Sequence, residues 1–419
     1  MIVPEVLAPA GNFEKLRAAL LFGADAVYFA GQNFGMRAAA DNFTLEQIEQ
    51  ACLYTHERGK RLYLAVNTVP RSRDIPALRD YLREISGMKD KPDALICADI
   101  GVVKLARQML PEIDVHVSTQ ANAQSWLACG AWAELGATRV ILSRELSFQD
   151  IREIRENLLA NNINIELECF VHGAMCVSYS GRCLISNYLT GRDANKGACT
   201  QPCRWDYYLA EEKRPGVYLP VIEDAERGTA FFSSKDLCMI EHIPDLVNSG
   251  VASLKIEGRM KSAYYAACIS NAYRLALDNY YAGALGPELV RKLKIETESV
   301  SRREYDTGYF YSEPAADAKI CGQPEYIREK IYLGLCVGYE GGLAAFEQRN
   351  KIARGQRVQV LSPGSLGRDA CADILLDEKN EPIESAPHPF QIFKIRVDFE
   401  VSEGDILRSG DADGAASRD

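Results

Sequence analysis

Four cysteines in the middle of the chain lie close together in a polar segment, with the spacing C-x6-C-x15-C-x3-C: Cys176, Cys183, Cys199 and Cys203. Their neighbours are mainly Gly, Ser, Asn, Lys and Arg, so apolar packing does not explain them. Four thiolates brought to one point can bind a metal ion or an iron–sulfur cluster. Structural zinc sites usually have two tight cysteine pairs, whereas this segment has one tight pair and two separated cysteines, which favours a cluster over zinc.

Most of the other cysteines lie within apolar helix or strand patterns. Such cysteines usually pack in protein cores, and we expect this of Cys52, Cys97, Cys129, Cys169, Cys268, Cys336 and Cys371. Cys238, in the run SSKDLCMI, lies at the start of a predicted amphipathic helix. Packing is its expected role, but it is the alternative to Cys203 as the fourth ligand.

The chain has 419 residues, of which 47% are hydrophobic and 25% charged, and a formal net charge of −10. This composition is typical of a soluble globular protein. No apolar run is long enough to span a membrane and the N-terminus lacks a basic leader, so we expect a cytoplasmic protein with no membrane partner. Thiols stay reduced in that compartment, which favours a metal site over disulfides. The negative charge argues against indiscriminate nucleic-acid binding but allows a local basic patch.

Eight short apolar segments, each followed by a helical pattern, are predicted β-strands: 5–9, 26–31, 61–67, 94–98, 114–119, 139–143, 164–171 and 253–258. This repetition predicts a (β/α)8 barrel of the TIM type over residues 1–283, with a doubly wound open sheet as the alternative. The four spaced cysteines lie on an insertion, residues 172–235, that follows the seventh strand. It should therefore leave from the C-terminal face of the barrel, where barrel enzymes have their active sites.

The remainder of the chain has a different pattern. Residues 284–304 are expected to form a helical connector. Residues 305–409 alternate short strands with turns, which predicts a small antiparallel β-barrel domain. Residues 410–419 are expected to be a disordered tail.

Two candidate acid–base residues lie at the seventh strand. His172 follows this strand and Glu168 is within it. Since a histidine at the C-terminal face of a barrel can transfer protons, we consider both residues catalytic candidates. His116 lies inside a strand and is expected in the core. The sequence has no HExxH or GxSxG motif, so it lacks the usual zinc-peptidase and serine-hydrolase signatures.

Several runs resemble peptidase family U32, also called collagenase-like: LAPAGNFEKLRAALLFGADAVYFAG, ECFVHGAMCVSYSGRCLIS, GACTQPCRW and SLKIEGRMKSAYY. The resemblance covers most of residues 1–310. Members of this family include proteins named as collagenases or proteases, and proteins that make 5-hydroxyuridine at the tRNA wobble position with prephenate. Other branches hydroxylate a ribosomal RNA cytidine, or act as a pair in ubiquinone hydroxylation. For the hydroxylating branches the resemblance implies a [4Fe–4S] cluster on Cys176, Cys183, Cys199 and Cys203.

The intact CTQPC pair and the length of the chain favour the tRNA branch. The resemblance then implies oxygen-independent 5-hydroxylation of wobble uridine, with tRNA and prephenate as partners. One alternative is a U32-type peptidase. Another is a non-catalytic iron–sulfur subunit of a hydroxylation complex. A homo-oligomer, or a hetero-oligomer with a family paralogue, is a further expectation.

Prephenate is a dicarboxylate, so this reading calls for arginines, whose planar guanidinium groups match carboxylates. Four arginines lie near the predicted C-terminal face: Arg37, Arg144, Arg182 and Arg259. We count Arg144 as a catalytic candidate and the others as substrate-binding candidates. Further substrate-binding candidates at strand ends are Asn67, Gln120, Lys255 and Glu257.

RNA binding requires basic residues together with flat side chains that stack on bases. One candidate stretch lies in the predicted C-terminal domain and contains Arg349, Lys351, Arg354 and Arg357. A second lies in the insertion and contains Arg192, Lys196, Arg204 and Trp205. The second is favoured because it surrounds the cysteines, whereas the first could equally be a solvated charged face.

Overall fold

The computed structural model describes residues 3–36, 41–176, 178, 180–181, 183–194, 197–205, 208–210, 218–220, 234–312 and 326–410. The chain divides into two compact units. The first comprises Met1–Leu16, Ala24–Lys261 and Arg303–Tyr326, and the second Arg17–Gly23, Ser262–Arg302 and Ile327–Asp419. In the described part of the chain, no helix is both long and apolar enough to cross a membrane.

The first unit contains a closed parallel barrel. Its strands are β1 (Glu5–Pro9), β2 (Ala26–Ala30), β3 (Arg61–Val66), β4 (Ala94–Cys97), β5 (Asp114–Val117), β6 (Arg139–Ile141), β7 (Glu166–Ala174) and β11 (Ser253–Ile256). Consecutive strands pair in parallel, and β11 pairs with both β7 and β1. This closure confirms the (β/α)8 prediction and excludes the open sheet, because an open sheet has no pairing between its first and last strands.

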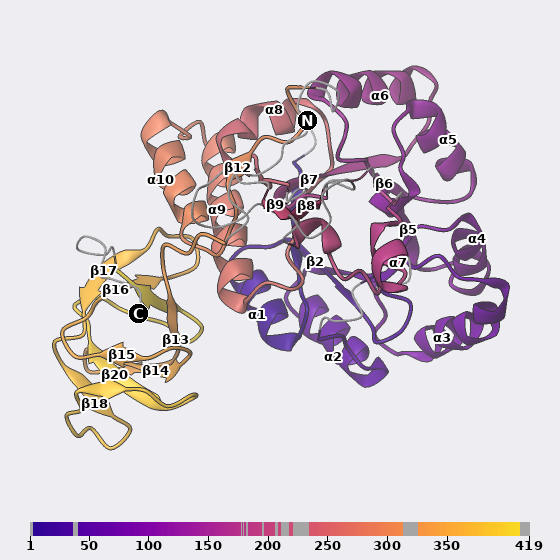
Figure 1. Ribbon diagram of the computed structural model, residues 1–419. Coiled ribbons are helices and arrows are strands. Elements are labelled where there is room, and N and C mark those ends of the chain that lie inside the picture. Colours follow the sequence, from indigo (N-terminus) through magenta and orange to yellow (C-terminus); the bar gives the residue numbers. More distant parts are fainter. Residues whose placement is uncertain are drawn as a thin grey trace. The chain divides into compact units, whose positions relative to one another are not determined.

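Helices follow the strands and lie around the outside of the barrel (Figure 1). They are α1 (Phe13–Leu21), α2 (Leu45–His56), α3 (Ile75–Gly87), α4 (Ile100–Met109), α5 (Trp126–Glu134), α6 (Phe148–Ala160) and α8 (Ile243–Asn248). Short 3-10 turns are η1 (Ser72–Asp74), η2 (Thr119–Ala121), η4 (Pro202–Arg204) and η5 (Ile240–His242). Local sequence determines several helix starts, since the side chains of Thr44, Ser125 and Ser147 accept hydrogen bonds from backbone amides of the first turn.

The insertion after β7 contains α7 (Ile185–Thr190) and the antiparallel pair β8 (Tyr208–Ala210) and β9 (Tyr218–Pro220). The chain then returns through β10 (Asp236–Cys238), which pairs antiparallel with the end of β7. Strand β12 (Tyr305–Asp306) pairs with β10 and brings Arg303 onto Asp236, with Nη2 and Oδ1 2.7 Å apart. The sequence pattern had assigned residues 303–312 to the connector and the β-domain, but they belong to the first unit.

The second unit combines two helices with an antiparallel sheet. Helices α9 (Ala263–Tyr281) and α10 (Pro287–Glu298) belong to it, so the helix after β11 groups here and not with residues 1–261. The sheet order is β17 (Arg368–Cys371), β16 (Arg357–Leu361), β21 (Ile406–Ser409), β13 (Tyr332–Glu340), β14 (Leu343–Gln348), β20 (Ile392–Arg396) and β18 (Leu375–Asp377). A separate pair is β15 (Ile352–Ala353) with β19 (Ser385–Ala386). Within the residues described, the edge strands β17 and β18 do not pair, so the predicted β-domain is confirmed as a half-barrel that does not close.

Candidate functional site

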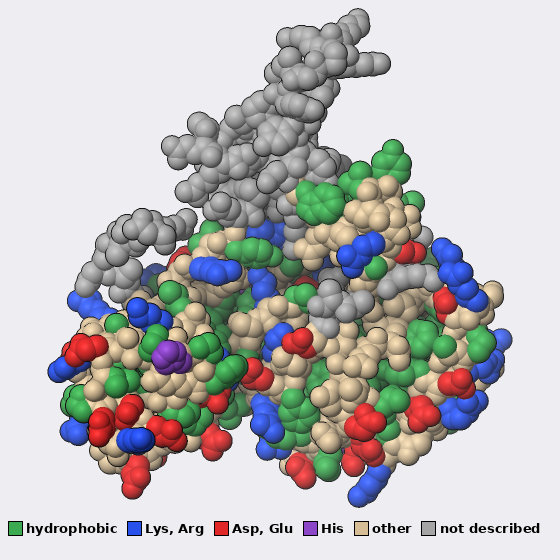
Figure 2. Space-filling view, turned by 60° about the horizontal axis from the view of Figure 1, so that its bottom comes forward, with side chains coloured by type: hydrophobic (Ala, Val, Ile, Leu, Met, Phe, Trp, Pro, Cys, Tyr) green, Lys and Arg blue, Asp and Glu red, His purple; other side chains and the backbone are tan. Residues whose placement is uncertain are grey.

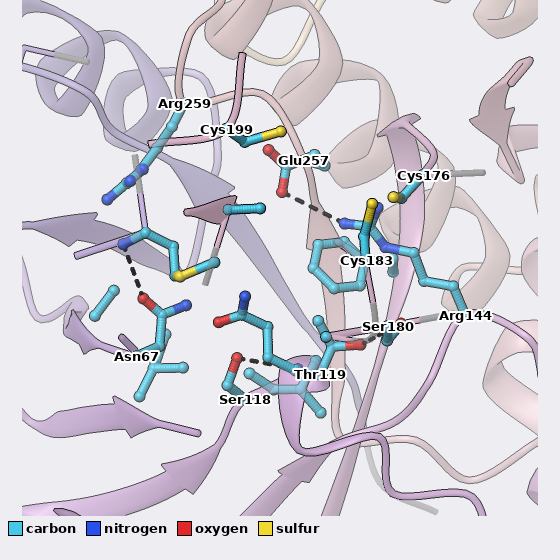
Figure 3. Close-up of a pocket in the computed structure, with 18 of the residues that line it drawn as sticks. Asn67, Ser118, Thr119, Arg144, Cys176, Ser180, Cys183, Cys199, Glu257 and Arg259 are labelled. Carbon is cyan, nitrogen blue, oxygen red and sulfur yellow. Dashed lines mark hydrogen bonds and ion pairs between the residues drawn. The ribbon is translucent and has the colours of Figure 1, made fainter. Parts of the chain in front are cut away.

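A cavity of about 210 Å³ lies at the C-terminal ends of the barrel strands. Its floor consists of inward-facing side chains that come from six strands: Tyr28, Ala65, Ile96, Ile141, Phe170 and Lys255. Its walls are polar residues that follow those strands: Asn67, Ser118, Thr119, Gln120, Arg144, Glu257 and Arg259. The insertion supplies the rest of the lining. Figure 3 shows charged groups and thiols facing a common space.

All four cysteines of the insertion line this cavity. Each of the four is at least partly exposed, and none forms a disulfide with another described cysteine. Among the described side chains, no three of the His, Cys, Asp and Glu groups are close enough together to hold a metal ion, so the thiols share a cavity without meeting at one point. Cys238 is buried in β10 and does not line the cavity, which favours Cys203 as the fourth member of the set.

Two glycines allow the insertion to pack against the barrel loops. Gly181 has φ +73°, and a Cβ there would lie 2.3 Å from the Gln120 carbonyl oxygen. Gly197 has φ +80°, and a Cβ there would lie 2.7 Å from the Gly35 carbonyl oxygen. Both positions therefore exclude any larger residue on two grounds, backbone conformation and space.

Arg144 is held rigidly at the cavity wall. Its Nη1 donates to the Ala174 carbonyl at 2.9 Å and its Nη2 lies 3.5 Å from Glu257 Oε2. The guanidinium carbon lies 3.9 Å from the centre of the Phe170 ring. Stacking and ion pairing together fix the plane of the guanidinium, as bidentate binding of a carboxylate requires.

Two amide side chains are also placed for binding. Asn67 Oδ1 accepts a hydrogen bond from the Met36 amide at 3.2 Å. The Oε1 atom of Gln120 is buried and accepts no hydrogen bond from the described part of the chain. A buried acceptor without a donor costs free energy, so Gln120 is suited to receive a donor from a ligand.

Lys255 occupies the floor of the cavity. Its Nζ donates to Glu168 Oε1 at 2.8 Å and lies 4.4 Å from the centre of the Tyr28 ring. Burial lowers the pKa of Lys255 from its ordinary value, although the charge of Glu168 opposes this effect. Burial would raise the pKa of Glu168, but Lys255 and Arg139 outweigh it and hold that pKa below its usual value.

Glu168 belongs to an ion network inside the barrel and not to the rim. Besides Lys255, it contacts Arg139, whose Nη1 lies 3.2 Å from Glu168 Oε2. Arg139 also pairs with Glu5 and, at 2.7 Å, with Glu166 Oε2. Glu168 is fully buried and does not line the cavity, so it reaches the site only through Lys255.

His172 does not face the cavity. The pairing of β7 with β11 shifts register between Lys255 and Ile256, where Ile256 pairs with His172 instead of the next residue. This bulge breaks the in–out alternation after Phe170. The imidazole packs on Tyr305, with Nε2 3.1 Å from the phenol oxygen. His172 is therefore not part of the cavity lining, and its catalytic role stays a prediction.

The remaining substrate- and RNA-binding candidates either lie outside the described residues or are not among the residues that line the cavity. Arg37, Arg182 and Lys196 lie outside the described residues, as does the side chain of Arg204. Arg192 and Trp205 are exposed on the insertion. In the second unit, Lys351 and Arg357 are exposed, but Arg349 pairs with Glu347 and Arg354 lies 3.4 Å from Glu384. This stretch therefore carries less free positive charge than its sequence indicates.

Sequence reasoning missed the two aromatic side chains of the floor, Tyr28 and Phe170. The available signal was their position on strands, where alternate residues face the barrel interior. His116 is buried against Tyr63, with ring centres 4.7 Å apart, so its expected core position is confirmed. Burial holds the pKa of His116 well below its usual value.

The sequence matches two family models and several known proteins. The profile of peptidase family U32 matches residues 11–319, and that of the U32 C-terminal domain matches residues 328–408. The chain is 35% identical to tRNA hydroxylation protein P1 of Bacillus subtilis (strain 168), over 97% of this chain and 95% of that protein. It is 35% identical to tRNA hydroxylation protein P of Escherichia coli (strain K12), over 87% of each. It is also 30% identical to a protein named collagenase from Porphyromonas gingivalis (strain ATCC BAA-308 / W83), over 86% of each.

Proposed function

The chain belongs to peptidase family U32, and we propose that it hydroxylates tRNA. The proposed reaction is oxygen-independent 5-hydroxylation of wobble uridine with prephenate as donor. Relatives named for tRNA hydroxylation match the chain over most of its length. The observation that carries the proposal is that one cavity contains all four thiols of the insertion together with Arg144, Lys255 and Arg259. The described lining thus has three basic side chains and one carboxylate, Glu257, an excess of positive charge that suits a small anionic oxygen donor such as prephenate.

We assign a [4Fe–4S] cluster to Cys176, Cys183, Cys199 and Cys203. The donor set fits, since the four cysteine side chains line one cavity and cysteine thiolates are the usual ligands of such a cluster. Cys176, Cys183, Cys199 and Cys203 would each supply one thiolate ligand. When bound, such a cluster supplies electron transfer beside the substrate.

The protein side chains bind and orient the reactants. Arg144, fixed by Glu257 and Phe170, provides a planar site for one carboxylate, and Arg259 is a second cation on the same cavity. Gln120 has a buried acceptor for a hydroxyl or amide donor of the ligand. Lys255 is the candidate for proton transfer, because it lines the cavity while Glu168 and His172 do not.

A peptidase is the second candidate, because a relative named collagenase matches most of the chain. One observation counts against it: the sequence has no HExxH or GxSxG motif.

Two measurements test the proposal. Nucleosides from cells that lack the protein should have lost 5-hydroxyuridine by mass spectrometry, and the wild-type gene should restore it. Anaerobically purified protein should contain about four irons per chain and absorb broadly near ~400 nm. Cys176→Ser should lose both the iron and the restoration, whereas Cys129→Ser, in the core of α5, should keep both. Unchanged 5-hydroxyuridine in the deletion strain, or iron-free protein that cleaves collagen, would contradict the proposal.

A further inference from the structure

Helix α7 in the insertion presents its polar face to the protein. The Ser186 hydroxyl is fully buried, donates to the Arg192 carbonyl at 2.8 Å and lies 3.1 Å from Thr200 Oγ1. One turn later, Thr190 Oγ1 lies 3.4 Å from the same Thr200 oxygen. These contacts fasten α7 to the segment that carries Cys199 and hold the orientation of the helix.

The other face of α7 is apolar and exposed. Leu184, Tyr188 and Leu189 are 67%, 88% and 46% exposed, and Trp205 of the same insertion is 42% exposed. Among the large apolar side chains of the described residues, Tyr188 is the most exposed. Surface helices normally turn their apolar side to the core, so the reversed arrangement indicates a face that a partner covers.

This face is continuous with the cavity. Cys183 and Ile185 line the cavity, while Leu184 between them points to solvent. A ligand that lies on α7 therefore reaches the cavity mouth within one helical turn.

The charge of the insertion favours nucleic acid as the partner. Arg192, two residues after α7, is exposed, and the sequence of residues 181–205 has four basic residues and one acidic residue in a chain with a net charge of −10. Over most of the face in Figure 2, basic and acidic side chains are interspersed. A local basic excess combined with exposed aromatic side chains is typical of surfaces that bind single-stranded nucleic acid.

We propose that the outward face of α7, with Tyr188 at its centre, stacks on an unpaired RNA base beside the nucleotide that enters the cavity. The inference rests on the proposed function. A base that enters this cavity must first be extruded from the stack of its neighbours. The neighbouring base loses its stacking partner when the target is extruded, and an aromatic side chain can replace that partner.

Binding of an RNA hairpin tests the proposal, with an unpaired loop uridine and the full-length protein in a fluorescence anisotropy assay. Tyr188→Ala should weaken binding roughly 5- to 150-fold, the range of base–aromatic stacking, and Tyr188→Phe should bind like the wild type. Tyr188→Leu keeps apolar area but lacks a flat ring, so it should bind like Tyr188→Ala. Leu127→Ala, at a similarly exposed apolar position on α5, is the matched control and should have no effect.

The outcomes separate the two proposals. If the wild type binds the hairpin and Tyr188→Ala binds equally well, only the stacking inference fails. If Tyr188→Leu binds as tightly as Tyr188→Phe, the face makes an apolar contact, as a protein partner would require, and stacking is refuted. If the wild type binds no hairpin, both the inference and the proposed function fail.

Discussion

Replacement of Glu168 by glutamine should strongly destabilise the barrel. Glu168 is fully buried between two cations, with Lys255 Nζ at 2.8 Å and Arg139 Nη1 at 3.2 Å. Removal of one partner from a buried ion pair leaves a buried charge without compensation, which costs about 3–5 kcal/mol. Glu168→Gln should therefore lower the free energy of unfolding of the first unit by this amount near neutral pH.

Glu166→Gln provides a matched control. Glu166 pairs with the same Arg139 at 2.7 Å, but its side chain is 52% exposed. An exposed ion pair contributes at most about 1 kcal/mol, so this variant should be nearly as stable as the wild type. All three tryptophans lie in the first unit, so urea denaturation followed by tryptophan fluorescence measures the unfolding of the barrel. If the free energies of unfolding of Glu168→Gln and Glu166→Gln differed by less than about 1 kcal/mol, the ion network inside the barrel would not lie in a low-dielectric environment, and the reasoning would be refuted.

The stability difference between the wild type and Glu168→Gln should depend on pH. The pKa of Glu168 is lower in the folded protein than its ordinary value of about 4.3, so its stabilising contribution is complete above that value. The contribution is lost as the pH falls through the lower, folded-state pKa. The stability difference between wild type and Glu168→Gln should therefore shrink in acid and stay constant from about pH 6 to 8. A gap that widened in acid would contradict this assignment of charge.

Three further variants test the site and the second unit. Arg144→Lys should weaken prephenate binding about 10-fold or more, because an ammonium group cannot replace the planar guanidinium that contacts Phe170 and Glu257. Isothermal titration calorimetry with prephenate measures this affinity. Gly181→Ala should reduce the iron content of purified protein, because its Cβ would lie 2.3 Å from the Gln120 carbonyl oxygen. Gly191→Ala is the control: Gly191 also has a positive φ but lies in open space, so this variant should retain more iron. Glu296→Gln should destabilise the second unit by about 3–5 kcal/mol, because it breaks the buried ion pair between Glu296 Oε1 and Arg408 Nη2, which are 2.7 Å apart. Hydrogen exchange of the backbone amides in the sheet strands measures this loss of stability.

The structure favours Lys255 over His172 for the proposed proton transfer. His172 was the candidate from the sequence because it lies beside the cysteines and histidine commonly transfers protons. The structure instead places a lysine in the cavity, with its pKa lowered by burial and a buried carboxylate behind it. Lys255→Gln variants therefore test proton transfer more directly than variants of His172.

The sequence by itself determined the barrel, the attachment of the insertion to the seventh strand and the set of four thiols. These features follow from local patterns, since apolar strands, helix starts and cysteine spacing do not depend on distant contacts. The strand ends also indicated Asn67, Gln120 and Arg144, because parallel strands bring their carboxyl ends to one face.

The tertiary structure alone decided which of these side chains act together. The β7 bulge turned His172 away from the cavity, and no local pattern in the sequence indicates a register shift that depends on pairing with β11. Barrel closure placed Glu168 beneath Lys255, because this contact joins strands β7 and β11 across 87 residues of chain. The outward face of α7 likewise depended on hydroxyl contacts with Thr200. Sequence patterns specify faces and ends of elements, but the side chains that meet there are selected by long-range pairing.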